Sequence, residues 1–199
     1  MAYYGKKVNG TVQSKTERFF DEDSSWSKAA LAKLRRGIGK EIGELPDVLE
    51  YVLMDFPDDF DQSWERERAE NAVYTALTLF AFHQQGKKNF MGIKREDDDN
   101  TISLGKAMRS LIQRNPENET AVKRRFDKIL SADDLKELAV HTRGAIGLLK
   151  TADISLDYGA FAEALYRFQL QEGKRGVILD WAQDYYRIEK SDEEREIVK

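Results

Sequence analysis

Residues 64–85 constrain the fold of this chain more strongly than any other segment. Apolar side chains recur there at intervals of three and four residues, the spacing of one face of an α-helix, and further apolar residues fill the opposite face. The two sets are Ala69, Ala72, Val73, Ala76, Leu77 and Phe80, and then Leu79, Ala81 and Phe82. A helix that is apolar on all sides must be surrounded by other elements, so this spacing predicts a central, largely buried helix.

Proline is scarce, with three residues in a chain of 199, where an average content of about 5% would give roughly ten. Because proline breaks helices and marks turns, its scarcity favours long helices over a turn-rich sheet protein. Caps, breakers and apolar spacing predict the other helices at 12–21, 25–36, 47–55, 103–113, 121–130, 133–150, 157–168 and 174–188. The fold class that follows is all-α, with about eight helices in two packed helical-bundle lobes.

The predicted organisation has four parts. They are a polar and mobile N-terminal arm over 1–22, an N-terminal lobe over 23–114, a C-terminal lobe over 115–190 and an acidic tail over 191–199. Asn115 and Pro116 break the chain between the two lobes. The composition of 86–100, which includes four consecutive acids, suits an exposed loop.

Composition excludes several classes of protein. The chain has no cysteine, which rules out a disulfide scaffold, a thiolate zinc site and a cysteine nucleophile, and which fits the reducing cytoplasm. The longest stretch without charged residues runs from 71 to 86, whereas a membrane span needs about twenty mostly apolar residues. We therefore expect a cytoplasmic protein without a membrane partner.

Two motifs that suggest ligands are weak. Gly37, Gly39 and Gly43 approach a dinucleotide-binding fingerprint, but the third glycine comes one position late and the segment follows a predicted helix instead of a strand. The end of a helix is the better interpretation. The two histidines, His83 and His141, lie on different predicted helices outside any ligand cluster, so we predict no metal, no cofactor and no catalytic residue.

One enzyme hypothesis remains as an alternative. Two pairs of acids spaced by three residues, Glu67 with Glu70 and Asp134 with Glu137, would place four carboxylates between helices, as in helical hydrolases that hold Mg²⁺. Such spacing is common on highly charged helices, so the same pairs are also explained as solvated surface.

Charge is segregated along the sequence. The net charge is −4, yet residues 28–40 contain five bases and no acid, whereas residues 41–61 contain eight acids and no base. Blocks of opposite sign can give one face a field that attracts phosphates and another that meets a basic protein. The acidic block supports an alternative function, a helical adapter that makes only protein contacts.

Basic residues also follow the edges of two predicted helices. Arg124, Arg125 and Lys128 lie opposite or beside the apolar face of 121–130. Lys136, Arg143 and Lys150 recur every seven residues, a row that rises about 10.5 Å per step. Such a row can follow a nucleic-acid backbone but carries no information about bases. The competing explanation is that these basic residues only keep the helix surfaces soluble.

The order of several segments resembles the CasB family, the small subunit of the type I-E CRISPR Cascade surveillance complex. The segments are WSKAALAKLRRG from Trp26, ALTLFAFHQ from Ala76, SLGKA from Ser103, RRF from Arg124, and later fragments that end at Trp181 to Arg187. The similarity covers roughly residues 24–188, and the ordered set carries it, since each fragment alone is common.

This resemblance implies a non-catalytic, all-helical subunit in antiviral defence that pairs with a second copy of itself and with other Cascade subunits. It also implies contacts with guide RNA and target DNA that stabilise the target strand and the displaced strand of the R-loop. Family members carry basic residues at positions that match Arg35, Arg36, Arg124, Arg125, Arg143, Lys174 and Arg175. With Lys128 and Lys150 from the helix edges, these are the candidate nucleic-acid-binding residues.

Overall fold

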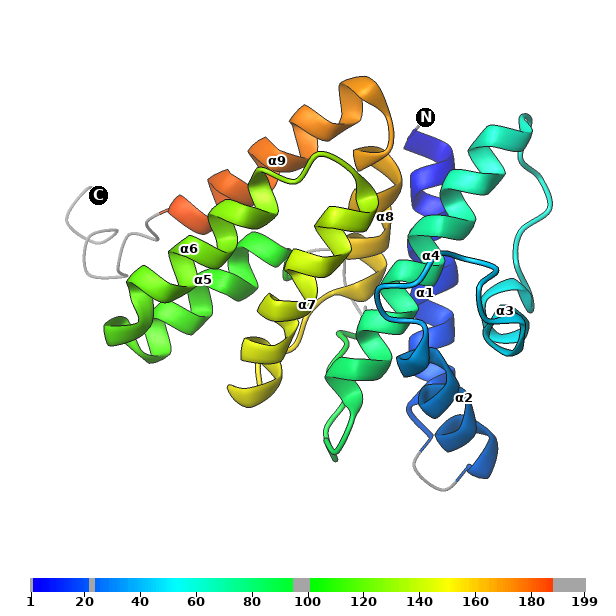
Figure 1. Ribbon diagram of the computed structural model, residues 1–199, viewed down its shortest axis with the longest axis horizontal. Coiled ribbons are helices and arrows are strands. Elements are labelled where there is room, and N and C mark those ends of the chain that lie inside the picture. The colour runs from blue at the N-terminus through cyan, green and yellow to red at the C-terminus, as the bar shows by residue number, and fades with distance from the viewer. Residues whose placement is uncertain (1, 22–23, 95–100, 188–199) are drawn as a thin grey trace, which may run out of the picture.

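The computed structural model describes residues 2–21, 24–94 and 101–187 (Figure 1), and these ranges are all-α, as predicted. They contain nine α-helices, one short 3-10 helix and no strand. The helices are α1 (Ala2–Phe19), α2 (Ser25–Arg36), α3 (Pro46–Leu53), α4 (Ser63–Gln84), α5 (Leu104–Arg114), η2 (Pro116–Asn118), α6 (Glu119–Leu130), α7 (Leu135–Thr151), α8 (Tyr158–Phe168) and α9 (Gln171–Tyr186). The acidic tail and the four-acid part of the predicted loop lie outside the described residues.

Helix α4 is the central element, as its sequence predicts. Every residue from Ala72 to Ala81 is buried, and α1, α2, α3, α7 and α8 all pack against it. The helix begins with a capping box, in which Gln62 and Glu65 satisfy each other's backbone N–H groups. Its apolar residues face neighbours on all sides, which explains why no single polar face is visible in the sequence.

The helices form two groups that share one apolar core. Figure 1 shows α1 to α4 and α8 on one side and α5, α6, α7 and α9 on the other. Helix α8 returns from the second half of the chain to pack along α1 and α4, and α5 packs along α9. Helices from both sides of Asn115 therefore contribute to each group, which differs from the division at that residue that the sequence suggested.

The prediction of a mobile N-terminal arm is wrong for residues 2–19, which form α1. Tyr4, Val8, Val12 and Phe19 are buried against the core, and α1 lies along α8 and α4. These side chains supply one apolar residue in each turn, and glycine, asparagine and threonine lie between them. The apolar spacing of the first turns was therefore too weak to predict a helix before residue 12. The ammonium group of Lys15, also buried, donates to the carbonyls of residues 51 and 54 at the end of α3.

Side-chain caps fix the starts of several helices. Ser24, Ser103 and Asp157 each accept a hydrogen bond from a backbone N–H three residues later, as serine and aspartate commonly do at the start of a helix. The predicted start of a helix at Asp133 is wrong by one residue at its cap. Asp134 caps α7 instead, because its carboxylate accepts from the N–H of Glu137 at 2.8 Å, while the N–H of Asp133 donates to the Glu137 side chain.

Among the helices in the described ranges, none combines the length and apolarity that a membrane span requires.

The burial of α1 predicts a measurable contribution to stability. Val12→Ala removes two buried methyl groups and leaves a cavity between α1 and its neighbours, so the free energy of unfolding in urea should fall by about 2 kcal/mol. Ser14→Ala, at an exposed position of the same helix, is the control and should change it by less than about 0.5 kcal/mol. Equal effects of the two substitutions would show that α1 is not packed as described.

Candidate nucleic-acid interface

An aromatic ring near the end of α4 organises the main basic surface. Phe82 is half-buried, and its ring lies over Gly147 of α7, where an added methyl group would lie 3.9 Å from the ring. Arg143 and Lys150 lie four residues before and three residues after Gly147, on the same face of α7. The guanidinium carbon of Arg143 is 5.8 Å and the Nζ atom of Lys150 is 4.8 Å from the ring centroid. Both cations therefore flank one aromatic face.

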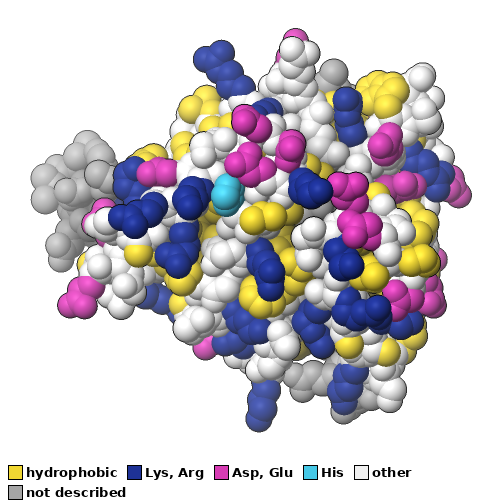
Figure 2. Space-filling model, in the orientation of Figure 1, with side chains coloured by type: hydrophobic (Ala, Val, Ile, Leu, Met, Phe, Trp, Pro, Cys, Tyr) yellow, Lys and Arg dark blue, Asp and Glu magenta, His cyan; other side chains and the backbone are white. Residues whose placement is uncertain are grey.

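Two further cations from other elements approach Lys150. Burial lowers the pKa of Lys150, and repulsion from Lys87 and Arg35 lowers it further. Lys87 follows α4, and Arg35 ends α2, where burial lowers the pKa of its guanidinium. We name Arg35, Lys87, Arg143 and Lys150 the basic cluster, in which Arg143 and Lys150 lie over the Phe82 ring and Arg35 and Lys87 act on Lys150. Figure 2 views the molecule in the orientation of Figure 1. Lys and Arg side chains gather over the lower half of the visible face, where α2, the end of α4 and α7 lie in Figure 1.

Most of this charge has no carboxylate partner. Among the described residues, Arg35, Arg143 and Lys150 form no ion pair, whereas Lys87 pairs with Asp153 at 2.5 Å. The Nζ atom of Lys150 also donates to the side-chain carbonyl of Gln85, at 3.3 Å. The basic cluster therefore presents three uncompensated positive charges at the junction of three helices.

A buried histidine lies beneath the basic cluster. The Nδ1 atom of His83 is 3.0 Å from the hydroxyl oxygen of Tyr158, and both side chains are inside the core. Burial, followed by repulsion from Lys150 and Lys87, lowers the pKa of His83 to about 4. A neutral imidazole inside the core suits a structural role for His83.

The other candidates lie apart from the basic cluster. Arg124, Arg125 and Lys128 are exposed along α6, and Arg175 is exposed on α9. None of these four pairs with a carboxylate among the described residues, and Arg125 contacts only the carbonyl of residue 121 in its own helix, at 3.5 Å. They form secondary basic positions without the aromatic centre of the basic cluster.

Two of the candidate nucleic-acid-binding residues form ion pairs with neighbouring acids. A guanidinium nitrogen of Arg36 lies 2.7 Å from the Asp47 carboxylate. The Nζ atom of Lys174 donates to the backbone carbonyl of Asp133 at 3.0 Å and lies 3.7 Å from its carboxylate. Such pairs leave less charge for an external phosphate than the basic cluster does.

The predicted row at seven-residue spacing is divided in the same way. Lys136 pairs with Glu41 at 2.8 Å, across 95 residues of sequence, so only Arg143 and Lys150 of the row reach the basic cluster. Sequence reasoning missed Phe82 and Lys87, which it placed in a buried face and in an exposed loop. The sequence signal that could have pointed to them is the pair Lys87 and Lys88, which follows a helix that carries Phe82 near its end.

The acidic block is largely neutralised inside the chain. Six of its eight acids form ion pairs with cations from distant or neighbouring elements. The pairs are Glu41–Lys136, Glu44–Lys40, Asp47–Arg36, Asp55–Arg18, Asp58–Arg66 and Asp59–Lys7. This block therefore offers little net charge to a basic partner, while cations elsewhere stay unpaired.

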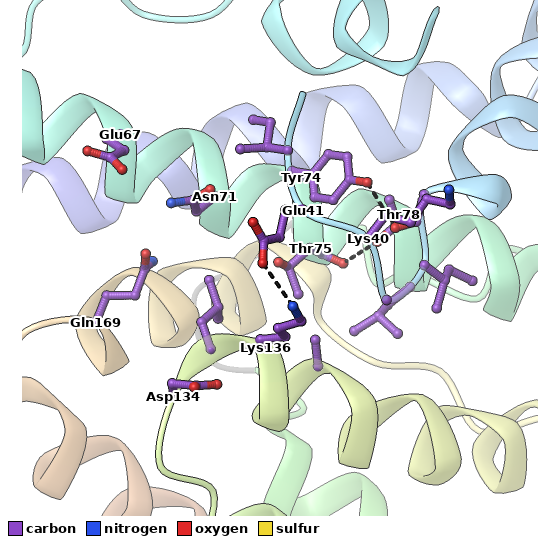
Figure 3. A pocket seen from close by; sticks show the side chains of 17 residues that line it. Lys40, Glu41, Glu67, Asn71, Tyr74, Thr75, Thr78, Asp134, Lys136 and Gln169 are labelled. Atoms are coloured by element: carbon purple, nitrogen blue, oxygen red, sulfur yellow. Dashed lines mark hydrogen bonds and ion pairs between the residues drawn. The ribbon is translucent and has the colours of Figure 1, made fainter. Parts of the chain in front are cut away.

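The carboxylates of the hydrolase hypothesis do not converge. Glu67 and Asp134 line a cavity of about 500 Å³ between α4, the loop after α2 and the start of α7, but they lie at separate edges of it (Figure 3). Glu70 pairs with Arg66 at 2.9 Å, and Glu137 is engaged at the start of α7. Across the described ranges, no three His, Asp or Glu side chains are close enough to hold a metal ion.

The glycine motif lines the same cavity and ends a helix. Gly37 is the C-terminal cap of α2, and its carbonyl accepts a hydrogen bond from the hydroxyl of Tyr74 at 2.9 Å. Gly39 follows with a φ of 77°, a conformation that glycine adopts without strain. The prediction of a helix end instead of a dinucleotide fingerprint is confirmed.

Comparison with known proteins identifies the family. The family model of CRISPR-associated protein Cse2 matches residues 30–186. The chain belongs to the Cse2 family, also called CasB. The crystal structure of CasB from Thermobifida fusca is 30% identical, with a TM-score of 0.73 over 93% of this chain and 98% of that one. No curated protein matches the sequence.

More distant structures share the Cse2 fold. CasB from Thermus thermophilus is 24% identical, with a TM-score of 0.64 over 89% of this chain and 97% of that one. A chain of a CRISPR RNA-guided surveillance complex is 19% identical, with a TM-score of 0.66 over 93% of this chain and 94% of that one. The resemblance to the CasB family that the ordered segments indicated is confirmed.

The environment of His83 predicts a dependence of stability on pH. The unfolded chain takes up a proton at this residue below its ordinary pKa of about 6.5, but the folded chain does so only near 4. Between pH 6 and 4 the fold should therefore lose about 1.4 kcal/mol per pH unit through this group. His83→Gln should remove that part of the slope in urea unfolding, whatever its effect at pH 7. Parallel pH profiles for the two proteins would contradict this assignment.

Proposed function

We propose that this chain is a non-catalytic structural subunit of Cascade that acts in the cytoplasm in antiviral defence. It binds nucleic-acid backbone without sequence preference and stabilises the target strand and the displaced strand of the R-loop. Membership of the Cse2 family supports its assembly with guide RNA, other Cascade subunits and a second copy of itself. The observation that carries the nucleic-acid role is the basic cluster, in which three cations lack a carboxylate partner within the described part of the chain.

The energetics of guide-directed recognition suit such a subunit. Base pairing reads the sequence, and the exchange of a DNA duplex for an RNA–DNA duplex is nearly balanced in free energy. A few phosphate contacts that release counterions therefore shift the outcome without reading bases. Arginine is well matched to this task, because its planar guanidinium meets two phosphate oxygens at once.

The cations outside the basic cluster extend the proposed surface. Arg124, Arg125 and Lys128 of α6 and Arg175 of α9 are exposed and available for phosphate contacts. Arg36 and Lys174 would first have to leave their carboxylate partners, so we assign them a smaller contribution. The acidic block of residues 41–61 was the main support for the adapter that makes only protein contacts. Because six of its acids form ion pairs within the chain, this support is weak.

Substitutions with equal loss of charge test this assignment. A triple variant of the basic cluster, Arg35→Gln, Arg143→Gln and Lys150→Gln, should weaken capture of target DNA by the assembled complex by about tenfold or more. The slope of log affinity against log salt should fall by about 2, since each phosphate contact on a single strand contributes roughly 0.7.

The matched control removes three ion-paired cations through Arg36→Gln, Lys136→Gln and Lys174→Gln. It should keep most of the affinity and of the salt slope, with both variants assembling normally. A control that loses as much affinity as the cluster variant would show that ion pairing does not decide which cations bind. Unchanged capture by both variants would favour the adapter that makes only protein contacts.

A further inference from the structure

A cavity of about 340 Å³ lies where the end of α5, the start of α6 and the end of α7 meet. Leu111, Val122 and Leu148 give it apolar walls, and Arg114 and Arg125 lie at its edge as exposed side chains. No Asp or Glu among the described residues lines it, in contrast to the large cavity of Figure 3. The volume falls at the lower end of the range of about 300 to 1,000 Å³ that is typical of small-ligand sites.

Both arginines retain donors for an anion. A guanidinium nitrogen of Arg114 donates to the carbonyl of Ala152 at the end of α7, which holds this side chain beside the cavity. Within the described ranges, the side chain of Arg125 donates only to the carbonyl of Ala121 in its own helix, at 3.5 Å. A guanidinium carries five N–H groups, so each side chain keeps several donors, and neither forms an ion pair with a described carboxylate.

The cavity is close to the basic cluster. Lys87 of the cluster pairs with Asp153, and the hydrogen bond from Lys87, then its charge, and then the charge of Arg114 lower the pKa of that carboxyl group. Arg114 therefore lies within electrostatic range of Asp153, one residue beyond the carbonyl that it contacts. Because Ala152 and Asp153 are adjacent, Arg114 at the cavity and Lys87 of the basic cluster contact neighbouring residues, and a strand that crosses the cluster can continue to the cavity.

A nucleotide has an apolar base and a charged phosphate. The apolar walls of this cavity match the base, and the guanidinium groups of Arg114 and Arg125 match the phosphate. We propose that this cavity receives one unstacked nucleobase of a single strand, with its flanking phosphates bound by Arg114 and Arg125. Aromatic or apolar surfaces accept any base, and the side-chain amides of Asn115 and Asn118, which also line the cavity, can each donate and accept. The site therefore adds affinity for bases without selecting a sequence, and the inference rests on the proposed nucleic-acid function.

Filling the cavity separates this contribution from backbone binding. Ala121 lines the cavity from an exposed position of α6, so Ala121→Trp places an indole in it and removes no charge. Ala29→Trp is the control, since Ala29 is exposed on α2 and lines none of the cavities described above. The probes are oligothymidylate and an abasic deoxyribose-phosphate strand with the same number of phosphates, each titrated at low salt against the isolated chain.

We expect the unmodified chain and Ala29→Trp to bind oligothymidylate at least about fivefold more tightly than the abasic strand, as one buried base requires. Ala121→Trp should lose this preference and bind the abasic strand as before, which also reports that it is folded. Equal binding of both strands by the unmodified chain, or a preserved preference in Ala121→Trp, would overturn the base site but leave the proposed function intact. Failure of the unmodified chain to bind either strand would overturn the base site, while the proposed function is judged separately by the capture of target DNA by the assembled complex.

A competition arm distinguishes a strand from a free nucleotide as the source of the base. Thymidine monophosphate should displace oligothymidylate only at millimolar concentration, because it lacks the neighbouring phosphates. Displacement at micromolar concentration would overturn the assignment to a strand.

Discussion

The burial of α4 on all sides is the constraint on which the rest of the structure depends. A helix without a polar face must be surrounded, and each large apolar side chain that it buries contributes about 1.5 to 3 kcal/mol. The C-terminal half of α4 therefore holds α2 and α7 against it, and the ends of these elements carry Arg35, Lys87 and Lys150 to one place. Repulsion between partly exposed cations costs only about 1 kcal/mol or less for each pair, so packing outweighs it.

The electrostatic character of the surface follows from which charges find partners. Individual exposed ion pairs add little to stability, with a median of about 0 to 1 kcal/mol, so their main effect here is selective neutralisation. Six acids of one block are compensated by cations from α1, α2, α4 and α7, and the loop after α2. A chain with a net charge of −4 thereby keeps positive charge at Arg143 and Lys150 beside Phe82.

The sequence predicted those features that depend on local chemistry. The apolar spacing of α4, the starts of α2 and α8 beside Ser24 and Asp157 and the helix end at Gly37 all depend on a few neighbouring residues, and all are confirmed. Only the second half of α1 was predicted, because the buried apolar stripe of this helix is narrow and its polar residues have low helix propensity. The candidate interface was predicted only in part, because partners such as Glu41 and Lys136 lie 95 residues apart and no pattern along the chain reveals their contact. Resemblance to the CasB family identified the family without showing which of its basic positions are free.

The central claim is that unpaired cations around Phe82, and not cations in ion pairs, contact nucleic acid. Two lysines of α7 provide a direct comparison, since Lys150 belongs to the basic cluster and Lys136 is paired with Glu41. Acetylation of lysines, quantified by mass spectrometry with and without a bound single strand, measures their contact with the ligand. The account predicts that the strand protects Lys150 strongly and leaves the acetylation of Lys136 unchanged. Protection of Lys136 without protection of Lys150 would contradict it.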